Sequence, residues 1–340
     1  MFVFNGIQPK DRERPLVNDG VRVSQREQAW EHYEQGRVEP AQFSFATSQS
    51  YTPLDVHKYA LRVLNVRHVE AIVAPYLAWA QLVYLLRHEK AYVNAVYGGS
   101  ELFMFDGVDK VILDVNFKKS TFTFASKQAI LRDLAVSAEQ FLDIAIMAGF
   151  DNFPTFPAFL PHPSEPVFRH ATEHVKSRGT AVNAIVMYPP PVGQPYLDTY
   201  ARARTLIKFS LVLTAGDGHI GALPLVLPLP ATVPVTKADV PADLGEVFSP
   251  RLPDEIYYQF FRGLVSPPLL TALATGYWVE SPPLCGGPLE YQRFVRSLTE
   301  QSTSARCVAL GLLSCILHPL WSKKQIVRPR HSVRRAARVG

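Results

Sequence analysis

Two short motifs in this sequence have the residue types and spacing of known chemical sites. Residues 216–221 spell GDGHIG, the GxGxxG pattern of dinucleotide-binding loops, and residues 170–174 spell HATEH, the HxxEH pattern of zinc peptidases. A dinucleotide loop must open a helix, but ALPLVLPLP follows here, and its prolines favour a hairpin turn instead. On a helix His170 and His174 share one face, yet no third ligand follows at a signature spacing, which favours an exposed helix face.

The cysteines and the apolar segments exclude further classes of site. Cys285, Cys307 and Cys315 form no CxxC pair, which excludes a disulfide scaffold and a zinc site of the usual spacing. The sequence also lacks a GxSxG motif, a P-loop lysine motif and a Cys–His nucleophile signature. No apolar stretch is long enough for a membrane span, and the first ten residues do not resemble a secretory signal. These features predict a reduced, intracellular protein with no cofactor and no membrane partner.

The 340 residues carry a net charge of +5, but the charge is uneven along the chain. Residues 301–340 hold eight Lys and Arg and no acidic residue, so the rest of the chain is slightly acidic. One hypothesis is therefore a nucleic-acid binder that neutralises phosphates with this tail, although a solvated, disordered end over 323–340 is favoured. The basic residues concerned are Lys323, Lys324, Arg328, Arg330, Arg334, Arg335 and Arg338.

The elements that must position any site alternate between strands and helices up to about residue 150. Start and stop signals support this pattern, for example the capping residues Ser126 and Ser137 and the helix-ending Gly149, whereas residues 37–52 have the composition of a loop. Such an alternation predicts an α/β domain with a mainly parallel sheet flanked by helices. We expect strands at 2–4, 69–75, 92–99, 110–117 and 120–125, and helices at 26–35, 53–65, 77–89, 126–134 and 137–149.

From Asp151 on, proline becomes frequent and helices dominate. Residues 209–215 and 222–229 are expected to form a hairpin, with helical segments before and after it. We therefore divide the chain into a first domain over 1–155, a Pro-rich connector with helices and a hairpin over 156–250, a helical domain over 251–322, and the basic tail.

Parts of the first domain resemble the XPG/flap-endonuclease family, a branch of the PIN-like nucleases. The matching segments are FVFNG, VEAIVAPYLAWAQLVYLL, YVNAVYGGSELFMF and FLDIAIMAGFD. In that family, carboxylates at strand ends hold two divalent cations that activate a water for phosphodiester hydrolysis. The resemblance implies a PIN-like fold, and the family's first strand, which precedes FVFNG, is missing here.

Most of the family's metal-binding positions hold other residues in this sequence. The resemblance places Asp151, in GFD, where a carboxylate is expected, so Asp151 and Glu101 would be the metal ligands if a metal binds. The phosphate-binding turn of the family is also missing, because NFPTFPAFLPHP contains no glycine. The resemblance therefore implies no intact catalytic set, with degenerate positions at Asn5, Leu77, Trp79, Gly99 and Glu101.

A longer resemblance covers about residues 1–322. APYLAWAQLVYL, VYGGSELFMFDGVDKVILDVNF, LPDEIYYQFFRGLVSPPLL and VESPPLCGG resemble the fungal maintenance-of-killer-toxin family of post-transcriptional regulators. That family joins an XPG-like pseudonuclease domain to a mainly helical domain. The resemblance implies a cytoplasmic protein that binds an ataxin-2-like poly(A)-binding-protein-binding factor and associates with mRNA and ribosomes. Compared with the family, both ends suggest a truncated gene model.

Two functions from different classes follow. The favoured one is a non-catalytic adaptor that regulates translation or stability of mRNA; its contact surface, or equally its core, would include Tyr257, Tyr258, Phe260 and Phe261. The alternative is a structure-specific endonuclease that uses Mg²⁺ to cut DNA or RNA. Its metal site would require the convergence of Glu101, Asp106, Asp109 and Asp151.

Overall fold

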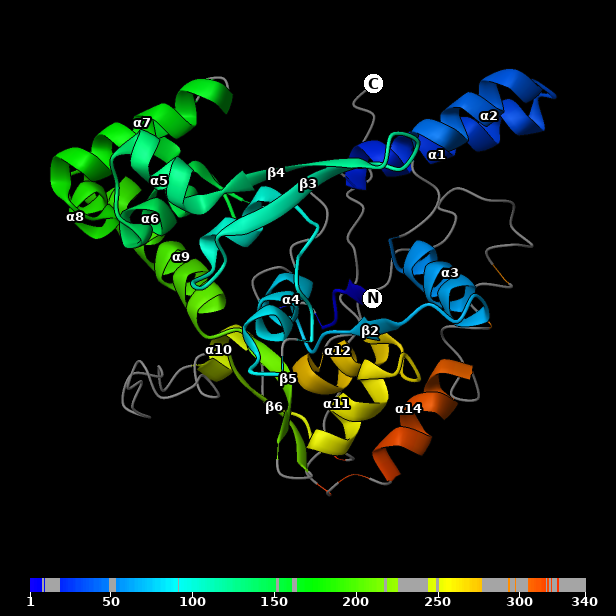
Figure 1. Cartoon of the computed structure of the whole chain (residues 1–340). Helices are drawn as coiled ribbons and strands as arrows, with labels where there is room; N and C mark the ends of the chain where they lie inside the picture. The colour runs from blue at the N-terminus through cyan, green and yellow to red at the C-terminus, as the bar shows by residue number, and fades with distance from the viewer. Residues whose placement is uncertain are drawn as a thin grey trace. The chain divides into compact units, whose positions relative to one another are not determined.

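The chain forms two compact units in the computed structural model (Figure 1). Unit 1 comprises Met1–Arg12 and Ile72–Arg262, and unit 2 comprises Glu13–Ala71 and Gly263–Gly340. The structure describes residues 1–7, 9, 19–48, 53–90, 92–150, 153–160, 164–216, 219–225, 244–248, 251–276, 293, 297, 305–315, 317, 319 and 323.

Unit 1 contains the strands of the molecule and most of its packed helices. The strands are β1 (Phe2–Phe4), β2 (Ala71–Val73, whose first residue falls in unit 2), β3 (Lys110–Asn116), β4 (Thr121–Ser126), β5 (Leu211–Gly216) and β6 (His219–Pro224). The helices are α4 (Ala78–Arg87), α5 (Lys127–Leu134), α6 (Ala138–Ala148), α7 (Ser164–Arg178), α8 (Ala181–Val186), α9 (Pro190–Lys208), α10 (Leu244–Phe248) and α11 (Asp254–Phe261). Two short 3₁₀ helices complete the unit, η2 (Ser100–Met104) and η3 (Pro157–Phe159).

The α/β class predicted for this region is confirmed, but the strands are arranged differently from the expected sheet. In the described part of the chain they form three two-stranded sheets, β1–β2, β3–β4 and β5–β6, and the last two are antiparallel. The physical reason is loop length: the turns after β3 and β5 are far too short for the crossover that a parallel pair requires. The expected strand at 92–99 contributes only one parallel bridge, between Tyr97 and Ile112.

The described helices and strands of the segment 156–250 pack within unit 1. Helix α6 contacts α7, α8 and α9, and α4 contacts β5. Two hydrogen bonds fix the second contact, since the Gln81 side chain accepts from the Leu213 N–H at 2.8 Å and donates to its carbonyl at 3.1 Å. The boundaries of the two units lie at residues 12/13, 71/72 and 262/263. They differ from the boundaries of the four segments expected from the sequence. The largest fully buried side chains of unit 1 include Tyr76, Phe105, Phe156, Phe248, Tyr257 and Phe260.

Unit 2 is helical in its described residues and contains α1 (Asp19–Glu34), α2 (Val38–Thr47), α3 (Pro53–Val66), α12 (Pro267–Thr275) and α14 (Ala305–Cys315). Helices α1 and α2 pack as a pair, in which the Trp30 and Phe45 rings meet edge to face at 5.1 Å. The loop expected over 37–52 was therefore a wrong prediction. Pro40 is compatible with the helix because it lies in the first turn of α2, where a backbone N–H has no intrahelical acceptor.

Several local predictions are confirmed. Ser126 caps α5, Ser137 forms a capping box with Gln140 at the start of α6, and Gly149 ends α6 with a positive φ of 87°. The expected hairpin is confirmed, because Gly216 of β5 pairs with His219 of β6; Asp217 and Gly218 of the GxGxxG pattern lie outside the described residues. No helix among the described residues is long and apolar enough to cross a membrane.

Candidate functional site

The first candidate site is the junction between β1 and α4, where Asn5 and Leu77 come together. The Asn5 Oδ1 atom accepts a hydrogen bond from the Ala78 N–H at 2.8 Å, and the Gly6 N–H donates to the Tyr76 carbonyl at 2.7 Å. Gly6 is required at this point, because an added Cβ would lie 1.9 Å from the carbonyl oxygen of Ala74. The amide of Asn5 therefore satisfies a backbone donor in the first turn of α4.

The neighbouring side chains make this junction apolar. Leu77 is completely buried, and Trp79, the second residue of α4, is half-buried. A carboxylate in the place of Leu77 would lose its hydration with no cation beside it, which is strongly unfavourable. The residues at this junction do not fit the oxygen-rich ligand set that two divalent cations require.

Gly99 and Glu101 flank the start of η2, which also contacts α4. Glu101 is half-buried and its carboxylate folds back toward Gly99. In the described part of the chain, no group of three or more His, Cys, Asp or Glu side chains lies close enough to hold a metal ion. Asp151 lies outside the described residues, so its pairing with Glu101 stays a prediction.

The other carboxylates considered as metal ligands have structural partners. Asp106 forms an ion pair with Lys208 at 2.9 Å. Asp109 directly precedes β3, and its side chain reaches the start of α5. Its Oδ1 accepts from the Ser126 hydroxyl and from the Gln128 N–H, both at 3.0 Å. The hydrogen bond from Gln128 lowers the pKa of Asp109 below its usual value. The structure therefore does not bring these two carboxylates together with Glu101 into one ligand set.

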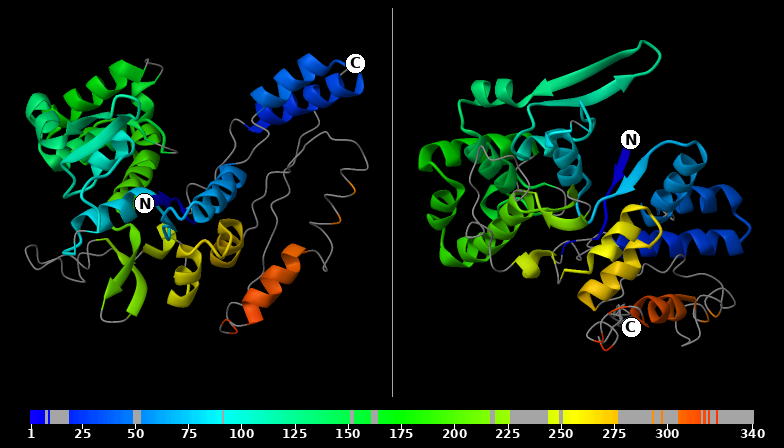
Figure 2. Two further views of the ribbon diagram at one scale, coloured as in Figure 1. Left: turned by 45° about the vertical axis from the view of Figure 1, so that its right-hand side comes forward. Right: turned by 60° about the horizontal axis from the view of Figure 1, so that its bottom comes forward.

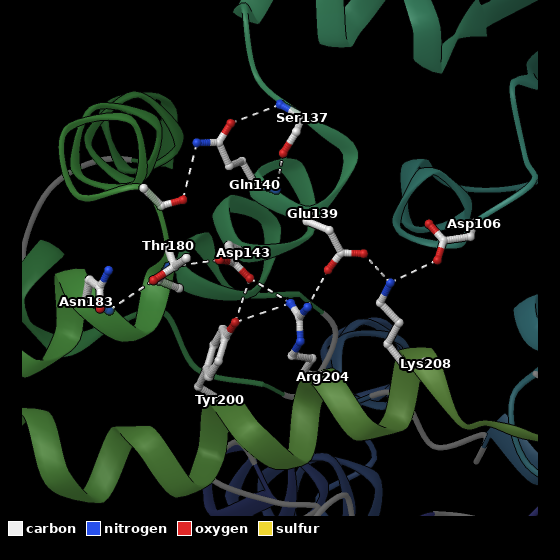
Figure 3. A network of polar contacts seen from close by, with 12 residues as sticks. Asp106, Ser137, Glu139, Gln140, Asp143, Thr180, Asn183, Tyr200, Arg204 and Lys208 are labelled. Atoms are coloured by element: carbon white, nitrogen blue, oxygen red, sulfur yellow. Dashed lines mark hydrogen bonds and ion pairs between the residues drawn. The ribbon is translucent and has the colours of Figure 1, made fainter. Parts of the chain in front are cut away.

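A second candidate site, absent from the sequence interpretation, lies where α6, α8 and α9 meet (Figure 3). Asp143 is only 4% exposed and receives three hydrogen bonds. Its Oδ2 accepts from the Ala181 N–H at 2.8 Å, and its Oδ1 accepts from the Tyr200 hydroxyl at 2.5 Å and from Arg204 at 2.8 Å. Glu139, one turn earlier on α6, contacts both Arg204 and Lys208. We call these six residues the α6–α9 network: Asp106, Glu139, Asp143, Tyr200, Arg204 and Lys208.

The charges of the α6–α9 network stabilise one another. Burial opposes ionisation of Asp106 and Glu139, but the hydrogen bond and the charge of Lys208 outweigh it, so both pKa values lie below their usual range. The same contacts raise the pKa of Lys208 despite its burial. Burial, together with the hydrogen bond to Asp143, raises the pKa of the Tyr200 phenol. These groups are therefore fixed in one charge state at neutral pH, which suits a structural role better than proton transfer.

An open groove of about 580 Å³ borders this network. Its lining includes Ser137, Gln140 and Thr180, whose polar side chains hydrogen-bond within the protein: the first two form the capping box of α6, and Thr180 caps α8. A sequence signal for the network did exist, because Glu139 and Asp143 on α6, and Tyr200, Arg204 and Lys208 on α9, repeat every four residues. The sequence alone does not indicate that these residues of α6 and α9, more than 50 positions apart, contact one another.

The remaining predicted residues lie on α11, in the basic tail and on α7. On α11, Tyr257 and Phe260 are fully buried and therefore belong to the core, whereas Tyr258 and Phe261 are half-buried. Lys323 is exposed, and the basic residues after it, from Lys324 to Arg338, lie outside the described residues. On α7, the His174 ring lies against Phe159 and within 3.3 Å of the Tyr188 hydroxyl, so it packs against neighbouring rings.

Comparison with known proteins identifies the family of this chain. A family model described as "Temperature dependent protein affecting M2 dsRNA replication" matches residues 241–330. The post-transcriptional regulator MKT1 of Cryptococcus neoformans is 38% identical over 333 residues, which cover 96% of this chain and 43% of that protein. This chain belongs to the MKT1 family. The family relative from Schizosaccharomyces pombe is 34% identical over 63% of the chain and 28% of its own length, so the chain spans less than half of either relative.

Solved structures similar to the chain include two nucleases. The catalytic core of Rad2 in complex with DNA has a TM-score of 0.36 and 20% identity, over 58% of this chain and 54% of that one. Flap endonuclease-1 from Methanococcus jannaschii has a TM-score of 0.37 and 19% identity, over 61% and 60%.

Proposed function

We propose that this chain is a non-catalytic, XPG-like scaffold that regulates the translation or stability of mRNA through protein and RNA partners. The observation that carries the proposal is the β1–α4 junction, where Asn5 caps a helix and Leu77 is fully buried. The relatives of the chain are named post-transcriptional regulators, which supports the same conclusion.

Two-metal hydrolysis needs several carboxylates that together neutralise two dications and replace part of their hydration shells. The junction instead offers an amide and an aliphatic side chain, and Asp106, Asp109 and Asp143 are each held by donors of the protein itself. These contacts among the described residues support a scaffold that does not bind two metal ions.

The partners belong to the same proposal. The family resemblance supports an ataxin-2-like factor that binds poly(A)-binding protein, together with mRNA or ribosome-associated complexes in the cytoplasm. Immunoprecipitation of the tagged full chain from fungal cells tests it. We expect poly(A) RNA and the ataxin-2-like factor in the precipitate, reduced or absent with a tag-only control. A precipitate that contains no ribonucleoprotein component would contradict the proposal.

The endonuclease alternative is favoured by one observation, the carboxylate of Asp151 in the GFD motif. Incubation of the purified chain with flap DNA and with structured RNA, in Mg²⁺ or Mn²⁺, separates the two functions. The scaffold proposal predicts no cleavage of either substrate. Cleavage that disappears in the Asp151→Ala variant would establish the nuclease instead.

A further inference from the structure

The β3–β4 hairpin is an arm of unit 1, and among the described residues its backbone hydrogen bonds to the rest of the unit lie at its base. Near the base, the Ile112 N–H donates to the Val96 carbonyl at 2.9 Å, the Lys127 N–H donates to the Asp109 carbonyl at 2.7 Å, and Val111 is fully buried. Figure 2 shows the rest of the hairpin extending away from the helices of the same unit. The Asn116 side chain accepts from the Lys119 N–H at 3.0 Å and so shapes the turn at the tip.

One face of this arm exposes aromatic rings. Phe122 and Phe124 are two residues apart on β4, so they share a face, and their side chains are 58% and 53% exposed. Their ring centroids lie 6.3 Å apart. Phe117, at the tip, is 88% exposed. Exposed phenylalanines at such positions are unfavourable for a hairpin in water, which points to a bound partner.

The charges on the arm indicate the chemistry of that partner. Lys110, Lys118 and Lys119 are exposed, and the Lys110 ammonium lies 5.7 Å from the centroid of the Phe124 ring. The single acidic residue between 110 and 126, Asp114, is paired with Thr123 and therefore lies on the opposite face from the rings. The aromatic face thus combines two apolar rings with the adjacent Lys110 ammonium, and the exposed Lys118 and Lys119 lie in the turn at the tip of the same arm.

We propose that this face binds single-stranded nucleic acid, with one base stacked on each of Phe122 and Phe124 and with phosphates held by the three lysines. Aromatic rings flanked by cations form the usual platform for unpaired bases, whereas protein-binding surfaces are depleted in lysine. This inference rests on the proposed function and adds a specific RNA contact to it. The rings need unstacked bases, so duplex RNA binds weakly.

The binding test uses the purified full chain and fluorescein-labelled oligonucleotides, namely U20 RNA, dT20 DNA and a 20-base-pair RNA duplex. The Phe122→Ala/Phe124→Ala variant removes both rings, and Thr121→Ala/Thr123→Ala on the opposite face of the same strand is the matched control. Base stacking contributes about 1–3 kcal/mol per base, so we expect at least a roughly tenfold weaker affinity for U20 in the first variant. The control binds as the wild type does. Circular dichroism confirms that both variants are folded.

Three outcomes would overturn the hairpin proposal. One is equal affinity of the wild type and the phenylalanine variant for U20, which would assign binding to the basic tail. A second is tighter binding of the duplex than of U20. The third comes from crosslinking with 4-thiouridine RNA: we expect the crosslink in the tryptic peptide 120–127, and crosslinks only elsewhere in the chain would contradict it.

The failure of this proposal differs from the failure of the proposed function. If the wild type and the phenylalanine variant precipitate equal amounts of poly(A) RNA from cells, the hairpin is not the contact, while the regulator proposal stands. If neither precipitates RNA and the purified wild type still binds U20 through the two rings, the hairpin proposal stands and the regulator proposal fails. The dT20 series shows whether the arm distinguishes RNA from DNA.

Discussion

The β1–α4 junction and the α6–α9 network lie in the same unit but differ in their carboxylate content. The junction, where a nuclease of the resembling family would keep acids, contains an amide cap and a buried leucine. The network is rich in charge, but its acids contact cations, a hydroxyl or a backbone N–H of neighbouring helices. Among the described residues, the acids of the network therefore connect helices, whereas Leu77 at the junction is part of the core.

The largest effect should come from the network. In Asp143→Ala, Arg204 loses its buried partner, and the Tyr200 hydroxyl and the Ala181 N–H lose their acceptor. Leaving the Tyr200 hydroxyl and the Ala181 N–H without an acceptor costs about 1–3 kcal/mol each. Arg204 is 34% exposed and keeps Glu139 as a partner, so the free energy of unfolding in urea should fall by about 2–6 kcal/mol in total. Asp133→Ala, at an exposed position on α5, is the control and should change it little. A change of less than about 0.5 kcal/mol in Asp143→Ala would show that the network does not stabilise the fold.

The junction should respond as a hydrophobic core. Leu77→Ala leaves a cavity at a fully buried position and should destabilise the protein by about 2–5 kcal/mol in the same urea experiment. Val186→Ala, at an exposed position on α8, removes a similar apolar side chain without a cavity and should be nearly neutral. Equal effects of the two substitutions would show that the junction is not packed as described.

The sequence predicts local features of this fold better than it predicts long-range contacts. The helices α4, α5 and α6 and the strands β3 and β4 follow from periodicity and from capping residues such as Ser126 and Ser137. Helix α2 was missed because its stability comes from the packing of Phe45 on Trp30, which no local pattern records. The α6–α9 network was missed for the same reason, since Asp143 and Arg204 meet only after the intervening chain has folded.

A smaller effect separates capping from metal binding at Asn5. In Asn5→Ala the first turn of α4 loses its side-chain acceptor, which should cost about 1 kcal/mol of unfolding free energy. Asn5→Asp restores the carboxylate of the family motif, keeps the acceptor and adds a favourable charge at a helix N-terminus, so stability should be unchanged or slightly higher. If Asn5→Asp is as unstable as Asn5→Ala in thermal denaturation, the side chain of Asn5 is not a cap.

The smallest effect is a pH dependence that originates at Lys208. Asp106 and Glu139 have pKa values below their usual 3.8 and 4.5 in the folded state, so their contribution to stability is present above these values and is lost as the pH falls through the lowered ones. The pKa of Lys208 is raised above 10.5, so its contribution is present below that pH and lost above the raised value. All three groups are partly exposed, and solvent screening keeps the effect small.

Lys208→Met is the variant that tests this pH dependence. Thermal denaturation between pH 3 and pH 7 should show a weaker loss of stability toward acid pH in Lys208→Met than in the wild type, because the pKa values of the two acids are then lowered less. Lys176→Met, on an exposed position of α7, should follow the wild-type curve. Identical curves for the wild type and Lys208→Met would contradict the coupling between Lys208 and the two acids.

The central proposal is that the part of the chain described by the structure offers too little fixed negative charge to bind two divalent cations. Titration of Mn²⁺ into the purified full chain, followed by the electron paramagnetic resonance signal of free Mn²⁺, measures this directly. The account predicts that the free signal rises in proportion to the added metal, with no saturable pair of bound ions, in the wild type and in Asn5→Asp alike. Saturable binding of two Mn²⁺ per chain that is lost in Asp151→Ala would contradict it.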